Sequence, residues 1–179
     1  MKHLVVALAA LGIVAGGARV TDAQDKEAGM KMSAIAQSPE WQKVKSLVGH
    51  WEGVVEMEGK KAPTTVEMRL TGDGSAVMHM MDRDTPHEMV TMIHPDGGRL
   101  LATHYCAAHN QPRMALVKSP AANQIAFEFV DGTNIKPGDT HMYGLVLTIT
   151  DADHHDATWT SLVDGKKTPP LTFRYSRKK

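Results

Sequence analysis

Residues 104–114 concentrate more groups capable of chemistry than any other stretch of the chain. His104, Tyr105 and Arg113 fall within it, next to the only cysteine, Cys106. An arginine can clamp a carboxylate or a phosphate through two parallel N–H groups, and a histidine or tyrosine can hydrogen-bond a ligand head group. We therefore predict ligand-binding roles for His104, Tyr105 and Arg113. The alternative is a polar hairpin whose side chains only satisfy the backbone of its turn.

Nucleophilic catalysis by a Cys–His pair is disfavoured. His104 and Cys106 fall on one face of a predicted strand, two residues apart, which separates them by roughly 7 Å. No carboxylate is evident to orient the imidazole, and alternation puts Tyr105 on the opposite face. We predict no catalytic residue and a buried, inert Cys106. A free reactive thiol and an intermolecular disulfide remain as alternatives.

The 10 histidines form none of the familiar zinc spacings. His154 and His155 adjoin Asp151, Asp153 and Asp156, a set that could hold a divalent cation. Because this segment reads as a surface turn, a solvated loop is the favoured interpretation. We predict no metal site.

Turn-forming residues recur about every eight to twelve positions from Trp51 onward, which is typical of an all-β fold. Short connections make neighbouring strands antiparallel, and closure of so many strands removes exposed edges. We predict an all-β fold, an up-and-down antiparallel β-barrel of about ten strands. The strands are predicted at residues 51–58, 63–71, 75–82, 87–94, 99–106, 112–118, 123–130, 141–150, 156–163 and 170–176.

A short helix is predicted just before the first strand. Ser38 supplies an N-cap hydroxyl, Pro39 suits the first turn, and Glu40 lies near the positive end of the helix dipole. Gly49 ends the helix. We expect this helix to cap one end of the barrel.

Alternation of apolar and polar residues along the strands predicts which side chains face the barrel interior. Met78, Met80, Met114 and Tyr143 are predicted to face inward and to contact a ligand, since methionine is unbranched and lines adaptable pockets well. The alternative is that methionine only fills the core. Other side chains predicted to face inward are Val66, Met68, Leu70, Ala76, Met89, Thr91, Ile93, Leu100, Ala102, His104, Cys106, Leu116, Ile125, Phe127, Phe129, Leu145, Leu147 and Ile149.

The N-terminal residues predict export. Residues 1–23 resemble a cleavable signal peptide, with an apolar run over residues 4–18 and a small residue, Ala23, at the cleavage site. The run is too short to span a membrane comfortably. We expect residues 24–37 to form a flexible leader and residues 38–179 a β-barrel domain, located in a periplasm or outside the cell.

The charge balance disfavours polyanionic partners. The 20 basic residues equal the 20 acidic residues in number, so no net field attracts nucleic acid or an anionic membrane. We predict a small-molecule partner, no nucleic acid and no membrane span, and leave the oligomeric state open.

Gly49-His50-Trp51, directly after the predicted helix, resembles the Gly-x-Trp opening of the calycin superfamily, which includes lipocalins, fatty-acid-binding proteins and nitrobindin-like barrels. The resemblance implies that Trp51 closes one end of the barrel and that a basic residue of the last strand lies across its ring. Arg174 is the predicted partner and Arg177 the second candidate. Such a contact is worth roughly 0.5–2 kcal/mol.

Departures from true lipocalins refine this resemblance. The sequence lacks the second motif of the lipocalins, their disulfides and their helix after the barrel. These differences favour a ten-stranded barrel like those of fatty-acid-binding proteins and nitrobindin-like proteins. Residues 103–106 and 110–114 also resemble secreted bacterial lipocalin-like proteins of unknown function.

The leading functional hypothesis is a secreted or periplasmic, non-enzymatic binding protein for a small apolar or amphipathic ligand held inside the barrel. The resemblance to nitrobindin-like barrels implies an alternative, haem held by an axial histidine with isomerase-type activity, for which His104 and His141 are candidates. A second alternative is a filled barrel that acts as a protein-interaction module.

Overall fold

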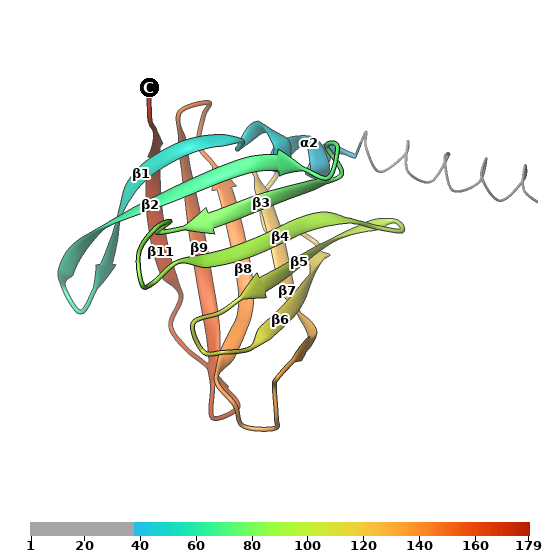
Figure 1. The fold of residues 1–179 in the computed structure, drawn as a ribbon, viewed down its shortest axis with the longest axis vertical. Helices are drawn as coiled ribbons and strands as arrows, with labels where there is room; N and C mark the ends of the chain where they lie inside the picture. Colours follow the sequence, from blue (N-terminus) through green and yellow to red (C-terminus); the bar gives the residue numbers. More distant parts are fainter. Residues whose placement is uncertain (1–37) are drawn as a thin grey trace, which may run out of the picture.

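Ten antiparallel strands close into a β-barrel in the computed structural model, which describes residues 38–179 (Figure 1). This confirms the predicted fold class; the predicted signal peptide and leader lie outside the described residues. The barrel strands are β1 (Gly49–Met57), β2 (Lys60–Thr71), β3 (Ala76–Met81), β4 (Met89–Asp96), β5 (Arg99–Tyr105), β6 (Gln111–Val117), β7 (Gln124–Thr133), β8 (His141–Ile149), β9 (His154–Val163) and β11 (Leu171–Arg177). The two-residue strand β10 (Lys166–Lys167) pairs with β9.

The barrel strands follow one another around the barrel in chain order, and β1 completes the ring by pairing with β11. In that last pairing Trp51 lies opposite Arg177. The hairpins at residues 58–59 and 164–165 turn on consecutive positive φ angles, of 51° and 75° and of 48° and 73°. These are the backbone conformations of two-residue type I′ turns, which match the twist of the strands they join.

One short helix, α2 (Pro39–Ser46), precedes β1 and covers one end of the barrel (Figure 1). Its start follows the predicted pattern, because the Ser38 hydroxyl accepts a hydrogen bond from the Trp41 backbone N–H at 3.2 Å. Trp41 and Val44 are buried. No helix among the described residues has the length and apolar character needed to cross a membrane.

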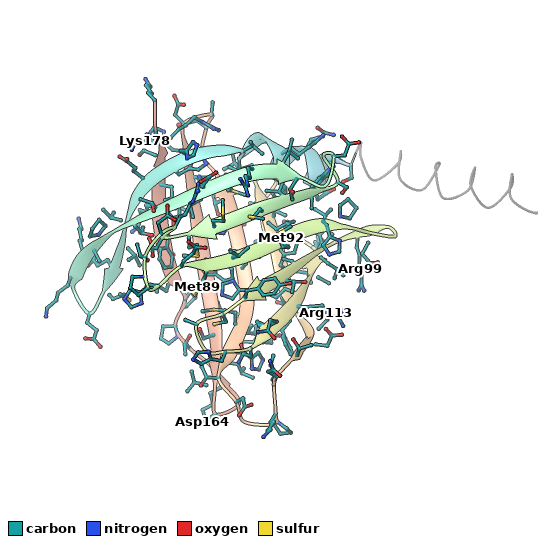
Figure 2. The ribbon with its side chains drawn as sticks, viewed as in Figure 1. Met89, Met92, Arg99, Arg113, Asp164 and Lys178 are labelled. Carbon is teal, nitrogen blue, oxygen red and sulfur yellow. The ribbon has the colours of Figure 1, made fainter. Side chains whose placement is uncertain are left out.

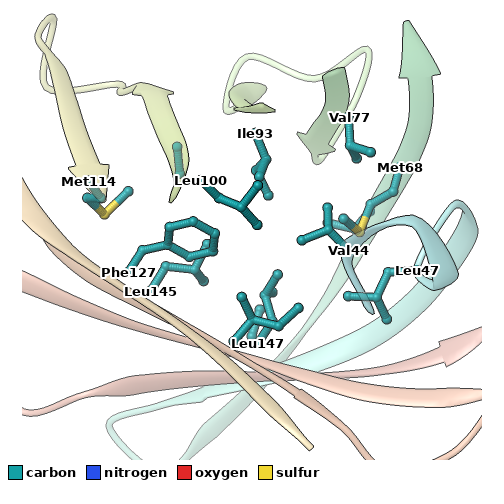
Figure 3. Close-up of a cluster of buried hydrophobic side chains, with 14 of the residues drawn as sticks. Val44, Leu47, Met68, Val77, Ile93, Leu100, Met114, Phe127, Leu145 and Leu147 are labelled. Atoms are coloured by element: carbon teal, nitrogen blue, oxygen red, sulfur yellow. The ribbon is translucent and has the colours of Figure 1, made fainter. Parts of the chain in front are cut away.

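Apolar side chains from α2 and from most of the barrel strands fill the end of the barrel next to the helix (Figure 3). The predicted inward direction is confirmed for most of the barrel. The members of this core that were predicted to face inward are Val66, Met68, Ile93, Leu100, Ala102, Met114, Ile125, Phe127, Leu145 and Leu147.

The predicted direction of β3 is wrong. Val77, His79 and Met81 face the interior, so Met78 and Met80 face outward. The strand carries nonpolar residues at nearly every position and therefore lacks the alternation from which a direction could be inferred. Its neighbours decide the direction: His79 lies opposite inward-facing residues on both β2 and β4.

Tyr143 was also predicted to face inward, and a β-bulge turns it out. The pairing of β8 with β9 shifts register between Met142 and Gly144, which leaves Tyr143 as the extra residue. A bulge of this kind re-aims the side chain that it inserts. Met142 packs against the core, whereas the Tyr143 hydroxyl donates to Glu128 Oε2 at 3.4 Å, in an exposed position.

Candidate functional site

A pocket of about 670 Å³ lies at the end of the barrel opposite α2. Its volume falls within the roughly 300–1,000 Å³ typical of small-molecule sites. Each of the strands β1, β3, β4, β5, β8, β9 and β11 contributes to it. The residues that line the pocket are Glu56, Met57, Glu58, Met81, Met89, His104, Met142, Trp159, Ser161, Thr168, Pro169, Pro170, Leu171 and Phe173.

The pocket walls are mainly apolar. Three methionines, Met81, Met89 and Met142, contribute to them together with Leu171 and Phe173. A methionine-lined interior was predicted, with Met89 among the inward-facing residues. The three methionines expected to contact a ligand lie elsewhere: Met78 and Met80 are on the outer face, and Met114 is fully buried in the core cluster outside the pocket lining.

His104 and Trp159 contribute the buried nitrogen atoms of the pocket. Their side chains are 1 % and 4 % exposed, and their ring centroids lie 4.8 Å apart. His104 Nδ1 lies 2.8 Å from the hydroxyl oxygen of Thr91. Within residues 38–179, neither His104 Nε2 nor Trp159 Nε1 has a hydrogen-bond partner. A buried N–H group left unpaired costs about 1–3 kcal/mol, so these two atoms mark the place where a polar group of a guest would be stabilised.

Two further histidines extend the polar interior beyond His104. His79 and His104 flank Thr91 on neighbouring strands, so the three side chains form one inward-facing row. His155 lies on the other side of the barrel, with ring centroids 4.2 Å from Trp51 and 5.1 Å from Tyr175. No other described residue hydrogen-bonds to the ring nitrogens of His79 or His155.

Burial keeps all three histidines neutral at pH 7. It lowers the pKa of His79 to about 4, and burial together with the neighbouring His79 lowers the pKa of His104 to about 4. The pKa of His155 falls to about 3 through burial, with smaller contributions from His79 and Arg177. These three side chains therefore make the interior polar without adding positive charge at pH 7.

The predicted cluster at residues 104–114 separates in the structure. Tyr105 is 51 % exposed, and Arg113 lies on the outer surface, where its Nε and Nη2 each donate to an Asp131 carboxylate oxygen at 2.5 Å (Figure 2). Cys106, expected to be buried, is half-buried and free. Of the residues predicted to bind a ligand, only His104 lines the pocket. Trp159 was missed, although its alternation with Ala157 could have indicated an inward direction.

The barrel closure uses Arg177 in place of the predicted Arg174. The Arg177 guanidinium lies over the Trp51 ring, 4.0 Å from its centroid. Strand parity explains the correction: Tyr175 is buried, so Arg177 shares its inward side, whereas Arg174 pairs with Val54 and is exposed.

The described residues include no group of three or more His, Cys, Asp or Glu side chains placed to hold a metal ion. Haem, the alternative implied by the resemblance, would need an axial nitrogen, and His104 Nε2 is available. His141, the other candidate, is not part of the pocket lining. The carboxylates of Glu56 and Glu58 at the pocket mouth do not suit the two propionates of haem, so the residues present do not fit the whole group.

Solved structures share this fold at low sequence identity. The crystal structure of Rv2717c from M. tuberculosis superposes with a TM-score of 0.54 at 15 % identity, over 79 % of this chain and 99 % of that one. A protein of unknown function from the DUF3598 family of Nostoc punctiforme gives a TM-score of 0.53 at 14 % identity, over 75 % of this chain and 49 % of its own length. No protein-family model and no curated protein matches the sequence. The comparisons thus show the barrel fold alone.

Proposed function

We propose that this protein is a secreted or periplasmic binding protein that holds a small apolar or amphipathic molecule in the pocket opposite α2. The observation that carries the proposal is the pair of unpartnered nitrogen atoms, His104 Nε2 and Trp159 Nε1, in a pocket with apolar walls. A few polar groups inside a mainly apolar cavity are the usual composition of a small-molecule site.

The division of the barrel supports this proposal over a completely filled barrel. Core side chains such as Val77, Ile93 and Leu147 occupy the end near α2 (Figure 3), whereas the other end retains the pocket. A guest with an apolar body would contact the methionine, leucine and phenylalanine walls. Burial of that body would contribute about 25 cal/mol for each Å² removed from water.

Titration with Nile red, an uncharged dye whose emission shifts to the blue in apolar surroundings, tests the pocket directly. Met89 and Met92 provide a matched pair of variants, because Met89 lines the pocket and Met92 lies on the outer face of the same strand (Figure 2). We expect one dye per protein, at least a tenfold loss of affinity in Met89→Trp, and no change in Met92→Trp. No dye binding, or equal binding by both variants, would exclude this site.

Haem, whose two propionates the Glu56 and Glu58 carboxylates at the pocket mouth do not suit, is tested separately. We expect no sharp Soret band on addition of haemin; such a band, abolished in His104→Ala, would show that the pocket holds haem in place of an apolar or amphipathic guest. Native mass spectrometry of the protein from its own host adds an independent test, since a bound guest would appear as a fixed increase in mass.

A further inference from the structure

We propose that the pocket recognises an uncharged carbonyl group, so that its ligand is a neutral amide, ester or ketone with an apolar body rather than a fatty-acid anion. This inference rests on the proposed function. It follows from which hydrogen-bonding atoms the pocket offers and from the charges around it.

Both unpartnered nitrogen atoms, Trp159 Nε1 and His104 Nε2, are hydrogen-bond donors. Trp159 Nε1 always carries a hydrogen. For His104, the hydroxyl of Thr91 fixes the tautomer: Thr91 is fully buried, and within the described residues its hydroxyl has His104 Nδ1 as its one partner. The hydroxyl hydrogen is therefore donated to Nδ1, which leaves the hydrogen of the neutral ring on Nε2. Two N–H groups on neighbouring rings, whose centroids lie 4.8 Å apart and whose planes are tilted by 46°, suit an acceptor oxygen with two lone pairs.

The charges around the pocket disfavour an anion. Neither lysine nor arginine is among the described residues that line it, and its charged members are Glu56 and Glu58. His104 adds no positive charge, because burial lowers its pKa to about 4. A carboxylate in the pocket would lose its hydration without gaining a counter-ion, whereas a neutral carbonyl needs only the two N–H groups.

Two cations near the barrel interior are engaged outside the pocket. Lys167 lies over the Tyr143 ring, 3.9 Å from its centroid, on the outer surface. Arg177 stacks on Trp51 at the opposite end of the barrel. Neither lines the pocket beside His104. Lys60 and Lys61, which pair with Met57 and Glu56 across the β1–β2 hairpin, are exposed and are also absent from the pocket lining.

Three ligands of equal chain length test this at pH 7.5: decanamide, methyl decanoate and decanoate, each measured by displacement of Nile red. We expect both neutral carbonyl compounds to bind at least tenfold more tightly than decanoate. In Trp159→Phe, which keeps an aromatic ring but removes the N–H group, this preference should fall to less than half of its wild-type ratio.

The outcomes separate the two proposals. Failure of Nile red to bind would overturn the binding function itself. Binding of Nile red with decanoate as tight as, or tighter than, the neutral compounds would overturn the carbonyl inference and leave the pocket standing. Binding of Nile red without displacement by either neutral compound would also overturn the inference. An unchanged preference in Trp159→Phe would remove Trp159 as the donor, and the inference with it.

Discussion

Arg177 lies over Trp51, with its guanidinium carbon 4.0 Å from the centroid of the indole ring. Its three nitrogen atoms donate to the carbonyl oxygens of Ser46, Val48 and Ala152 at 3.0, 2.8 and 2.9 Å. A single side chain of the last strand therefore holds the end of α2, the start of β1 and the loop before β9. The indole is fixed in turn, since Trp51 Nε1 donates to the Leu47 carbonyl at 2.8 Å.

Replacement of Arg177 should weaken the whole barrel. Arg177→Ala removes three hydrogen bonds and a cation–π contact, and we expect the free energy of unfolding to fall by about 3 kcal/mol. Arg174→Ala is the matched control, because Arg174 is exposed on the outer face of the same strand and should change stability little. Urea unfolding followed by far-UV circular dichroism measures both. Equal losses in the two variants would show that Arg177 has no special part in closure.

Gly49 should be intolerant of a side chain. A Cβ at this position would collide with the Arg177 guanidinium, and its φ of +145° strains any other residue. We expect Gly49→Ala to lower the free energy of unfolding by roughly 1–3 kcal/mol. Gly98→Ala provides the control, since nothing lies within 4 Å of a Cβ there. A neutral Gly49→Ala in urea unfolding would mean that the guanidinium moves aside without loss.

Acid should destabilise the protein before its carboxylates titrate. An unfolded histidine takes up a proton near pH 6.5, whereas the folded chain lowers the pKa of His79 and His104 to about 4 and of His155 to about 3. The unfolded state then binds more protons as the pH falls from about 6.5 toward 4, so stability present above pH 6.5 is lost across that window. Each histidine contributes a slope of up to about 1.4 kcal/mol per pH unit.

Urea unfolding at pH 7.5, 6.5 and 5.5 measures this slope. His155→Phe removes one of the three buried histidines. The free energy of unfolding of this variant should therefore change less steeply with pH, by up to about 1.4 kcal/mol per pH unit, the contribution of one proton. His154→Phe is the matched control, because His154 is exposed and contacts Asp151, so its replacement should leave the slope close to that of the unaltered protein. A stability that does not change between pH 7.5 and 5.5 would contradict the neutral, buried state of the three rings.

Arg113→Ala should leave ligand binding intact. Arg113 and Asp131 form an exposed pair on the outside of the barrel, so Nile red should bind this variant as it binds the unaltered protein. The pKa of Asp131, lowered chiefly by its hydrogen bond to Arg113, should rise toward its ordinary value. Carboxylate titration by NMR would detect that rise. A loss of dye affinity would instead place Arg113 in the site.

Glu56→Lys should change which head group the pocket accepts. Glu56 is exposed at the pocket lining, so the substitution replaces a negative charge with a positive one without altering the core. We expect decanoate affinity to increase severalfold and methyl decanoate affinity to stay within twofold. Glu52→Gln, near the other end of β1, controls for the loss of a charge on that strand. An equal change in the affinities for decanoate and methyl decanoate would indicate that the charge at the pocket mouth does not affect which head group is bound.

The architecture could be predicted from the sequence because turn residues and alternation are local signals. The prediction of which side chains face inward failed where the local sequence favoured neither face of a strand. The nonpolar residues of β3 favoured neither face, and the neighbouring strands turned His79 inward. The bulge at Tyr143 and the choice of Arg177 over Arg174 depend on register with distant strands.

The candidate site was harder to predict because it also depends on contacts between strands that are distant in the sequence. His104 was identified from its unusual surroundings in the sequence, but Trp159, its partner across the barrel, is far away along the chain. Arg113 and Tyr105 are close to His104 in sequence and lie outside the barrel in space. Proximity along a strand pair does not tell which wall of the barrel a side chain faces.

The core packed against α2 gives the pocket a fixed depth. Longer homologues of a guest cannot slide past the row of His79, Thr91 and His104, so each added methylene must extend toward the Glu58 turn and finally into water. Affinity should therefore rise with chain length only until the tail reaches the rim, and then level off. The chain length at which affinity levels off would therefore report the distance from the pocket rim to the packed core.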